Sequence, residues 1–192
     1  MKILATLLLL FGAALAQTAA HAPITLAFST VDAQATNVTS KQIVMVAVTV
    51  SYKEKTYMTA IHDFYFIQGG MAAGEVKEVV HRDSTRTITA VKPVFVQFRD
   101  GSFWGDTSPF NDPNSPASYV VSNRKPVLAM FQGALSAAQQ GDQALIDYLS
   151  GVTDEETRGF AKRFLSIQKS SGTSAAVQQI QQRVNAAENR PF

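Results

Sequence analysis

The sequence predicts an α+β protein in which an antiparallel β-sandwich is followed by a helical segment. Up to residue 107, apolar and polar residues alternate in short runs, which is typical of half-buried strands. Beyond a loop rich in Pro, Asn, Asp and Ser, apolar residues recur every three or four positions, which is the spacing of amphipathic helices. Because strands and helices do not alternate along the chain, we do not expect a parallel sheet.

The first sixteen residues have the three parts of a cleavable secretory signal. Lys2 supplies a positive charge, residues 3–13 are apolar, and Ala14 and Ala16 offer the small side chains that signal peptidase reads. The apolar run is shorter than the ~20 residues that cross a bilayer, so a membrane anchor is not expected. We expect cleavage after Ala16, or as late as Ala20, and a mature protein in the periplasm or outside the cell.

Composition narrows the classes of function. The chain contains no Cys, which excludes disulfides, thiolate metal sites and Cys nucleophiles. Its formal net charge is only +2, and Lys and Arg do not cluster, so nucleic acid and anionic membranes are not expected partners. With 192 residues and no second apolar run that could span a membrane, the chain is expected to build its core by packing alone.

Residues 24–107 are the expected sandwich. Residues 42–52 form the clearest strand, because Val at every second position places one apolar face on it. A second strand over 56–67 follows a charged turn, and a Pro divides 85–99 into a short edge strand and a further strand. Other strands are expected at 24–29, 31–37 and 74–81, and from 102 onwards. Six to eight short strands at even spacing fit an immunoglobulin-like sandwich.

Residues 108–118 are the expected linker loop, because three Pro residues and several Asn, Asp and Ser residues favour turns. Residues 119–192 follow as the helical segment, in which Thr153 and Glu156 predict a capping box. The apolar stripe of each helix is narrow. The helices must therefore pack on the sandwich, on one another, or on a partner such as a second copy of the chain.

The hairpin from Phe98 to Asp106 resembles the F-x-D-G-S-x-W-G-D motif of a set of small exported bacterial proteins that are uncharacterised. The segment from Asp63 to Phe66, followed by Gly74-Glu75, is similar to a strand and G-E pair in the same proteins. The resemblance covers residues 24–107. It implies an immunoglobulin-like β-sandwich and brings no activity with it.

Phe103, Trp104 and Phe110 are the candidate binding residues. Aromatic side chains on loops at the end of a sandwich stack on sugars or anchor protein partners. The alternative is that Trp104 fills the core. The expected function is an exported, non-catalytic binding or structural module, whose partner is a protein or carbohydrate of the cell envelope.

Two alternative functions depend on histidine. Cleavage before His21 would expose an amine and an imidazole that bind copper, with His62 or His81 as a further ligand. His81, Asp83 and Ser84 contain the residue types of a hydrolase triad, although a triad is defined by geometry. The sequence has no G-x-S-x-G nucleophile motif, so an enzyme is not the leading expectation. Without a metal, His62 is simply a His at the edge of an apolar face.

Oxygen-bearing side chains gather in the hairpin and the linker loop. They are Asp100, Asp106, Asn111, Asp112 and Asn114. Calcium takes six to eight oxygen ligands, so it is the ion that such a loop would bind. The spacing does not match an EF-hand, and the same residue types are what turns require.

Overall fold

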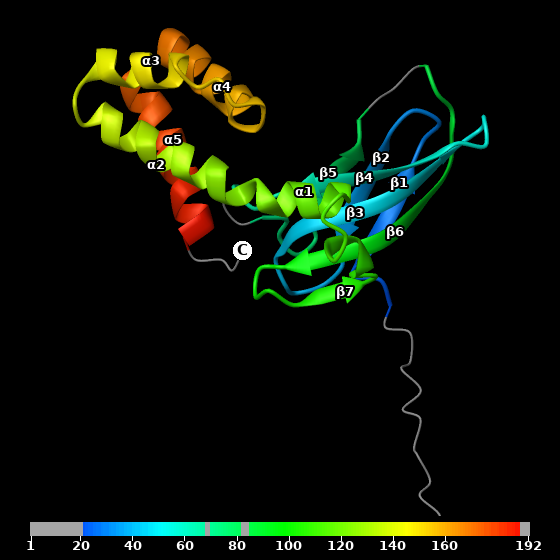
Figure 1. Ribbon diagram of the computed structural model, residues 1–192. Coiled ribbons are helices and arrows are strands. Elements are labelled where there is room, and N and C mark those ends of the chain that lie inside the picture. The colour runs from blue at the N-terminus through cyan, green and yellow to red at the C-terminus, as the bar shows by residue number, and fades with distance from the viewer. Residues whose placement is uncertain (1–20, 68–69, 82–84, 189–192) are drawn as a thin grey trace, which may run out of the picture.

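The computed structural model describes residues 21–67, 70–81 and 85–188 (Figure 1). The predicted signal peptide with both of its cleavage sites, and Asp83 and Ser84 of the hydrolase alternative, lie outside the described residues. In the described part, seven strands come first along the chain and the helices follow, which confirms the predicted α+β order. None of the described helices is long and apolar enough to cross a membrane.

Three strands form the first sheet. Its order is β1-β2-β5, and both pairs are antiparallel. The strands are β1 (Ile24–Phe28), β2 (Ala33–Asn37) and β5 (Val76–Val80). Asn37 closes the end of β2: its buried side-chain amide donates to the carbonyls of Lys41 at 2.8 Å and Met71 at 2.9 Å. A buried amide with both partners in place holds the β2–β3 turn against the β4–β5 connection.

Four strands form the second sheet, in the order β4-β3-β6-β7, and all neighbours are antiparallel. The strands are β3 (Ile43–Tyr52), β4 (Tyr57–Asp63), β6 (Ile88–Phe98) and β7 (Phe103–Gly105). The predicted break at Pro93 is wrong, because β6 runs through it. The register between β3 and β6 shifts next to Pro93, and this irregularity accommodates a residue that cannot donate to the ladder.

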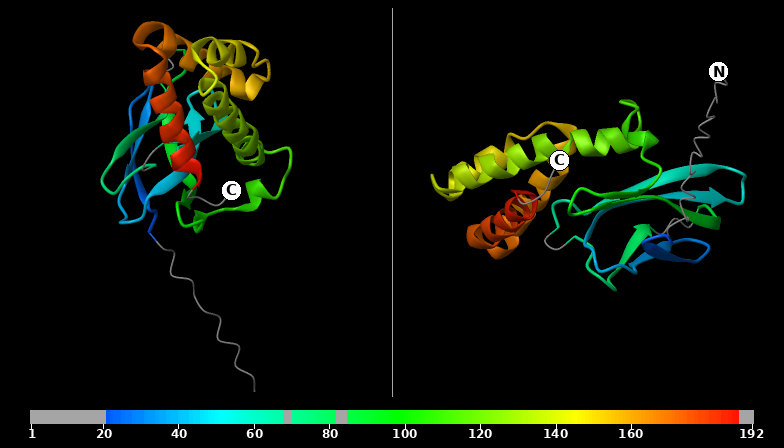
Figure 2. Two further views of the ribbon diagram at one scale, coloured as in Figure 1. Left: turned by 90° about the vertical axis from the view of Figure 1, so that its left-hand side faces the viewer. Right: turned by 90° about the horizontal axis from the view of Figure 1, so that it is seen from below.

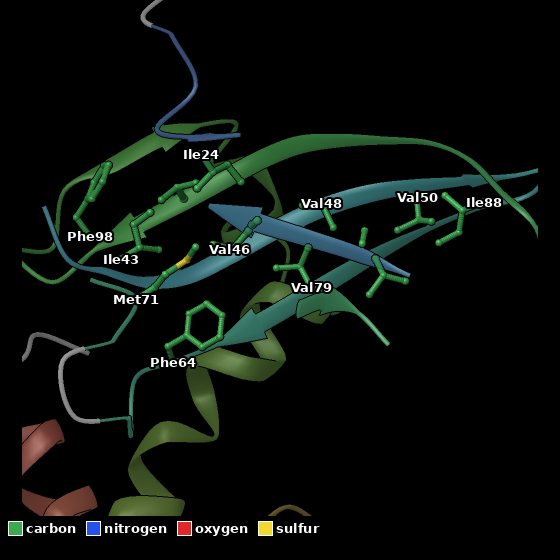
Figure 3. Close-up of a cluster of buried hydrophobic side chains, with 14 of the residues drawn as sticks. Ile24, Ile43, Val46, Val48, Val50, Phe64, Met71, Val79, Ile88 and Phe98 are labelled. Carbon is green, nitrogen blue, oxygen red and sulfur yellow. The ribbon is translucent and has the colours of Figure 1, made fainter. Parts of the chain in front are cut away.

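The two sheets pack face to face around one apolar core. Figure 3 shows this core, in which Ile24 of β1 and Val79 of β5 belong to the same cluster as Val46, Val48 and Val50 of β3. The other face of β3 is covered at one end: Met45 and Ala47 are buried beneath residues of the loop after β7 and of the first helix, whereas Thr49 and Ser51 further along the strand are partly exposed.

Helices follow in the remaining part of the chain that the structure describes. They are a short 3₁₀ helix η1 (Ser108–Phe110), α1 (Pro116–Ser122), α2 (Arg124–Ala138), α3 (Asp142–Ser150), α4 (Glu155–Ser171) and α5 (Thr173–Glu188). The linker is shorter than predicted, since α1 begins at Pro116 behind the cap of Ser115. The predicted capping box is also wrong: Asp154, not Thr153, is the N-cap of α4 and accepts from the Thr157 amide.

Helix α1 lies on the outer face of the second sheet, and α2 to α5 gather beside one end of the sandwich (Figures 1 and 2). The connection from β4 to β5 reaches into this bundle. Tyr65 and Phe66, which lie two and three residues beyond β4, belong to the same buried cluster as Phe131 and Phe164. The sandwich therefore contributes side chains to the core of the helical bundle.

Candidate functional site

A buried arginine joins the sandwich to the helices. Arg124 opens α2, and its side chain is 1% exposed. Its Nε and Nη2 donate to the two carboxylate oxygens of Asp63 at 3.1 and 2.9 Å, and Nη2 also donates to Gln97 at 2.9 Å. The guanidinium lies 4.3 Å from the ring centre of Tyr65. A buried charge needs such partners, and these bonds tie the start of α2 to β4 and β6; the buried Nη1 has no hydrogen-bond partner among the described residues.

A pocket of about 310 Å³ opens beside this network. Phe66, Val127 and Phe160 supply apolar walls, and Glu155 and Glu156 stand at the N-terminus of α4. A hydrogen bond joins the Glu156 carboxylate to the hydroxyl of Tyr119, another lining residue, and holds the pKa of that phenol above its usual range. The residues that line this pocket include no His.

The structure brings two of the three predicted binding residues together, Phe103 and Phe110, and turns Trp104 away from them. Successive side chains of a strand point to opposite faces of the sheet, so the side chains of Phe103 and Trp104 in β7 lie on opposite faces. Trp104 turns inward and packs, partly buried, against the sandwich core. Phe103 is 50% exposed on the outer face, with its ring centre 5.3 Å from Phe95 and 6.3 Å from Phe110. Phe95 and Phe110 are 4.3 Å apart, which completes an aromatic cluster.

An apolar pocket of about 230 Å³ lies next to this cluster, between the second sheet and the segment that leads into α1. Its floor is formed by Ala47, Ile61 and Phe95, and its cover includes Phe110 and Ala117. The other lining residues are Thr59, Val94, Pro109 and Pro116. None of these side chains titrates. The sequence predicted Phe110 here, but the small Ala residues that leave the space were not recognised, because only the tertiary fold places them opposite the loop.

Hydrogen bonds hold the cover of this apolar pocket in place. The Ser118 hydroxyl donates to the Phe110 carbonyl at 2.9 Å, and the Ser115 hydroxyl bonds to the Pro109 carbonyl. At the start of the segment, the Asp106 carboxylate accepts from the Ser108 amide at 2.8 Å. The pocket is thus roofed by a fixed turn, and it is formed before any ligand arrives.

Two of the three histidines come together. The ring centres of His62 in β4 and His81 after β5 are 5.6 Å apart. The Nδ1 of His81 lies 3.1 Å from a carboxylate oxygen of Glu78. Burial is the main cause of a lowered pKa at His62; the nearby His81 lowers it further, whereas a hydrogen bond to the Val79 backbone acts in the opposite direction.

His21 lies apart from this pair. It is exposed and precedes Ile24, which pairs with Asn37 at one end of the first sheet. His81 follows Val80, which pairs with Ala33 at the other end. The length of β1 therefore separates His21 from His81, and the described residues do not place the N-terminal histidine in a copper site with the other two.

The oxygen-bearing residues of the hairpin and loop serve the turns. Asp100, Asp106 and Asp112 each accept from the backbone amide two residues further along, at 2.8–2.9 Å. Asp100 also pairs with Lys41 at 2.8 Å, and the hydrogen bonds from Lys41 and Ser102 hold its pKa well below the usual range. Within residues 21–67, 70–81 and 85–188, no three His, Asp or Glu side chains are grouped to hold a metal ion. A calcium site stays a prediction.

The structure thus offers a preformed apolar pocket beside exposed aromatic rings, an acidic pocket at the junction, and a histidine pair. No family model matches the sequence, and neither a curated protein nor a solved structure matches it. The function must therefore be inferred from the residues that line these three sites.

Proposed function

We propose that this chain is an exported, non-catalytic binding module, which takes an apolar group of its ligand into the pocket beneath Phe110. The observation that carries the proposal is the lining of that pocket. It is apolar and preformed, and the half-exposed ring of Phe103 belongs to the aromatic cluster beside it. Apolar pockets with exposed aromatic rings beside them are typical of sites for ligands and for the anchoring side chains of a partner.

Binding without turnover follows from the same lining. General acid–base or nucleophilic catalysis requires a titratable or nucleophilic group within hydrogen-bond reach of the ligand. The only hydroxyl in the pocket belongs to Thr59, and the side chains that line it include no base to activate that hydroxyl.

We further propose that the sandwich is immunoglobulin-like. Named in chain order as strands A, B, C, C′, E, F and G, the sheets read A-B-E and C′-C-F-G. Immunoglobulin-type sandwiches also place A, B and E in one sheet and C, F and G in the other. The strand order supports the topology that the hairpin resemblance implies. Export to the periplasm or the medium is supported by the three-part signal in the first sixteen residues.

The test uses indole, a small apolar probe, and amide chemical shifts of the mature protein. We expect the shifts of Ala47 and Ala117 to move saturably as indole is added. Thr59→Phe, which places a ring at an exposed residue of the pocket, should abolish the response. Thr25→Phe, on an exposed residue of β1 in the other sheet, is the matched control and should leave it unchanged. Equal binding by both variants would refute the pocket.

A further inference from the structure

The two sheets present neighbouring edge strands on one side of the sandwich. β4 is an edge of the second sheet, β5 is an edge of the first, and the two strands contact each other. His62 lies in β4 and is half buried, whereas the His81 side chain, directly after β5, is 78% exposed. The histidine pair therefore spans the gap between the sheets and is reachable from solvent.

The spacing of the two rings suits a shared metal ion. Zinc lies about 2.0–2.1 Å from an imidazole nitrogen, so the centres of two rings on one tetrahedral ion are about 5 Å apart once the ring radius is added. The centres of His62 and His81 are 5.6 Å apart, and their planes are inclined by 69°. The observed spacing of the ring centres is therefore close to that of two imidazoles on one ion.

Each ring also has the second contact that metal-bound histidines have. A ligating His almost always donates its other N–H to a carboxylate or a backbone carbonyl, and this bond fixes the ring. His81 has the carboxylate of Glu78 at 3.1 Å from Nδ1, which leaves Nε2 free for a metal. His62 hydrogen-bonds to the backbone of Val79 and so also keeps one nitrogen.

We propose that His62 and His81 bind one divalent transition-metal cation, such as Zn²⁺, through one ring nitrogen each at the β4–β5 edge. Imidazole ligands select zinc, copper and nickel over magnesium and calcium, which prefer oxygen. Since the described residues supply no third ligand, water completes the coordination, and the ion remains exchangeable. This site differs from an N-terminal copper site, because it does not use His21.

The test is calorimetric titration of the mature chain with Zn²⁺ alone. We expect one ion per chain, and His62→Gln and His81→Gln should each abolish binding. Glu78→Gln should weaken binding about 10- to 100-fold, the usual effect of removing the partner that orients a ligating His. His21→Gln is the matched control, since it removes the third histidine and should change nothing.

A measurement on the unaltered protein covers a variant that fails to fold. Zn²⁺ should shift the ring resonances of His62 and His81 together and leave those of His21 in place. Binding that survives both His62→Gln and His81→Gln, or that depends on His21, would overturn the proposal. The proposal would also be overturned if Zn²⁺ left the ring resonances of His62 and His81 unchanged, because the two rings would then only pack edge to face. Neither result bears on the indole pocket, which lies on the outer face of the second sheet.

Discussion

Single side chains at the junction have roles that local sequence cannot predict. Arg124 lies in the predicted helical segment, where the sequence gives it no particular role, yet it is one of the most buried side chains of the described chain. Its partners Asp63 and Gln97 are 61 and 27 residues away. Only the docking of α2 on the end of β4 brings these residues together. The periodicity of apolar residues in a sequence does not indicate contacts between polar side chains so far apart in the chain.

Arg124→Ala should destabilise the protein by about 3 kcal/mol, because it leaves a largely buried carboxylate at Asp63 without its cation. Arg124→Lys should recover only part of this loss, since an ammonium cannot reproduce the fork that bonds Asp63 and Gln97 at once. Urea unfolding of the three proteins measures both effects. Full recovery by Lys would show that charge alone matters at this position.

The exposed ion pair with Lys41 should keep the pKa of the Asp100 carboxyl low. The folded pKa of Asp100 is lowered, so the pair stabilises the fold above the ordinary carboxyl pKa of about 3.9 and loses this effect as the pH falls towards the folded value. Lys41→Met should raise the Asp100 pKa in a carbon-detected NMR titration. Asp106, whose pKa is lowered by Ser108 instead, is the internal control and should not move.

At the scale of elements, periodicity predicted most strands and failed where a tertiary contact intervened. The strand over 42–52 is β3 almost unchanged, because alternating Val is a strong local signal. Pro93 was expected to break β6, but an irregular register keeps the strand whole. Of the predicted binding residues, Phe103 and Phe110 lie in one aromatic cluster, whereas Trp104 faces the core. The alternation of side chains along a strand places Phe103 and Trp104 on opposite faces of β7, and the prediction that grouped them did not take this alternation into account.

Two glycines inside helices should respond in opposite ways to the same substitution. A Cβ at Gly133 of α2 would overlap the hydroxyl of Tyr148 on α3, whereas a Cβ at Gly159 of α4 would meet nothing within 4 Å. Gly159→Ala should therefore stabilise the protein by up to about 1 kcal/mol, the difference in helix propensity. Gly133→Ala should destabilise it by about 1–3 kcal/mol, as overpacking does.

Thermal unfolding of both glycine variants tests this difference. Tyr148→Phe combined with Gly133→Ala should regain part of the loss, because the nearest atom is then gone. If both single variants gained stability, α2 and α3 would not pack as closely as the structure has them.

At the scale of the molecule, aromatic residues that follow β4 extend from the sandwich into the separate core of the helical bundle. Phe66, which follows β4, is 8% exposed, and its ring centre lies 5.2 Å from Phe131 and 6.4 Å from Phe160. The sequence predicted a sheet-forming part and a helical part but left the packing partner of the helices open. The aromatic run after β4 looked like the end of a strand, so nothing marked it as the contact between the two parts.

Phe66→Ala should uncouple the two parts. The chain has one Trp, which packs against the sandwich core, so its fluorescence reports on the sheets, whereas far-UV circular dichroism is dominated by the helices. The two signals of the wild-type protein should follow one denaturation curve, as expected of a single cooperative unit. In Phe66→Ala the helical signal should be lost first, since removing a buried Phe costs about 3 kcal/mol and the sandwich keeps its own core.

The control variant is Phe103→Ala, which removes an exposed ring on the sandwich and should leave the two denaturation curves coincident. If the two curves also coincided in Phe66→Ala, the contacts of Arg124 with its partners would be enough to couple the bundle to the sandwich.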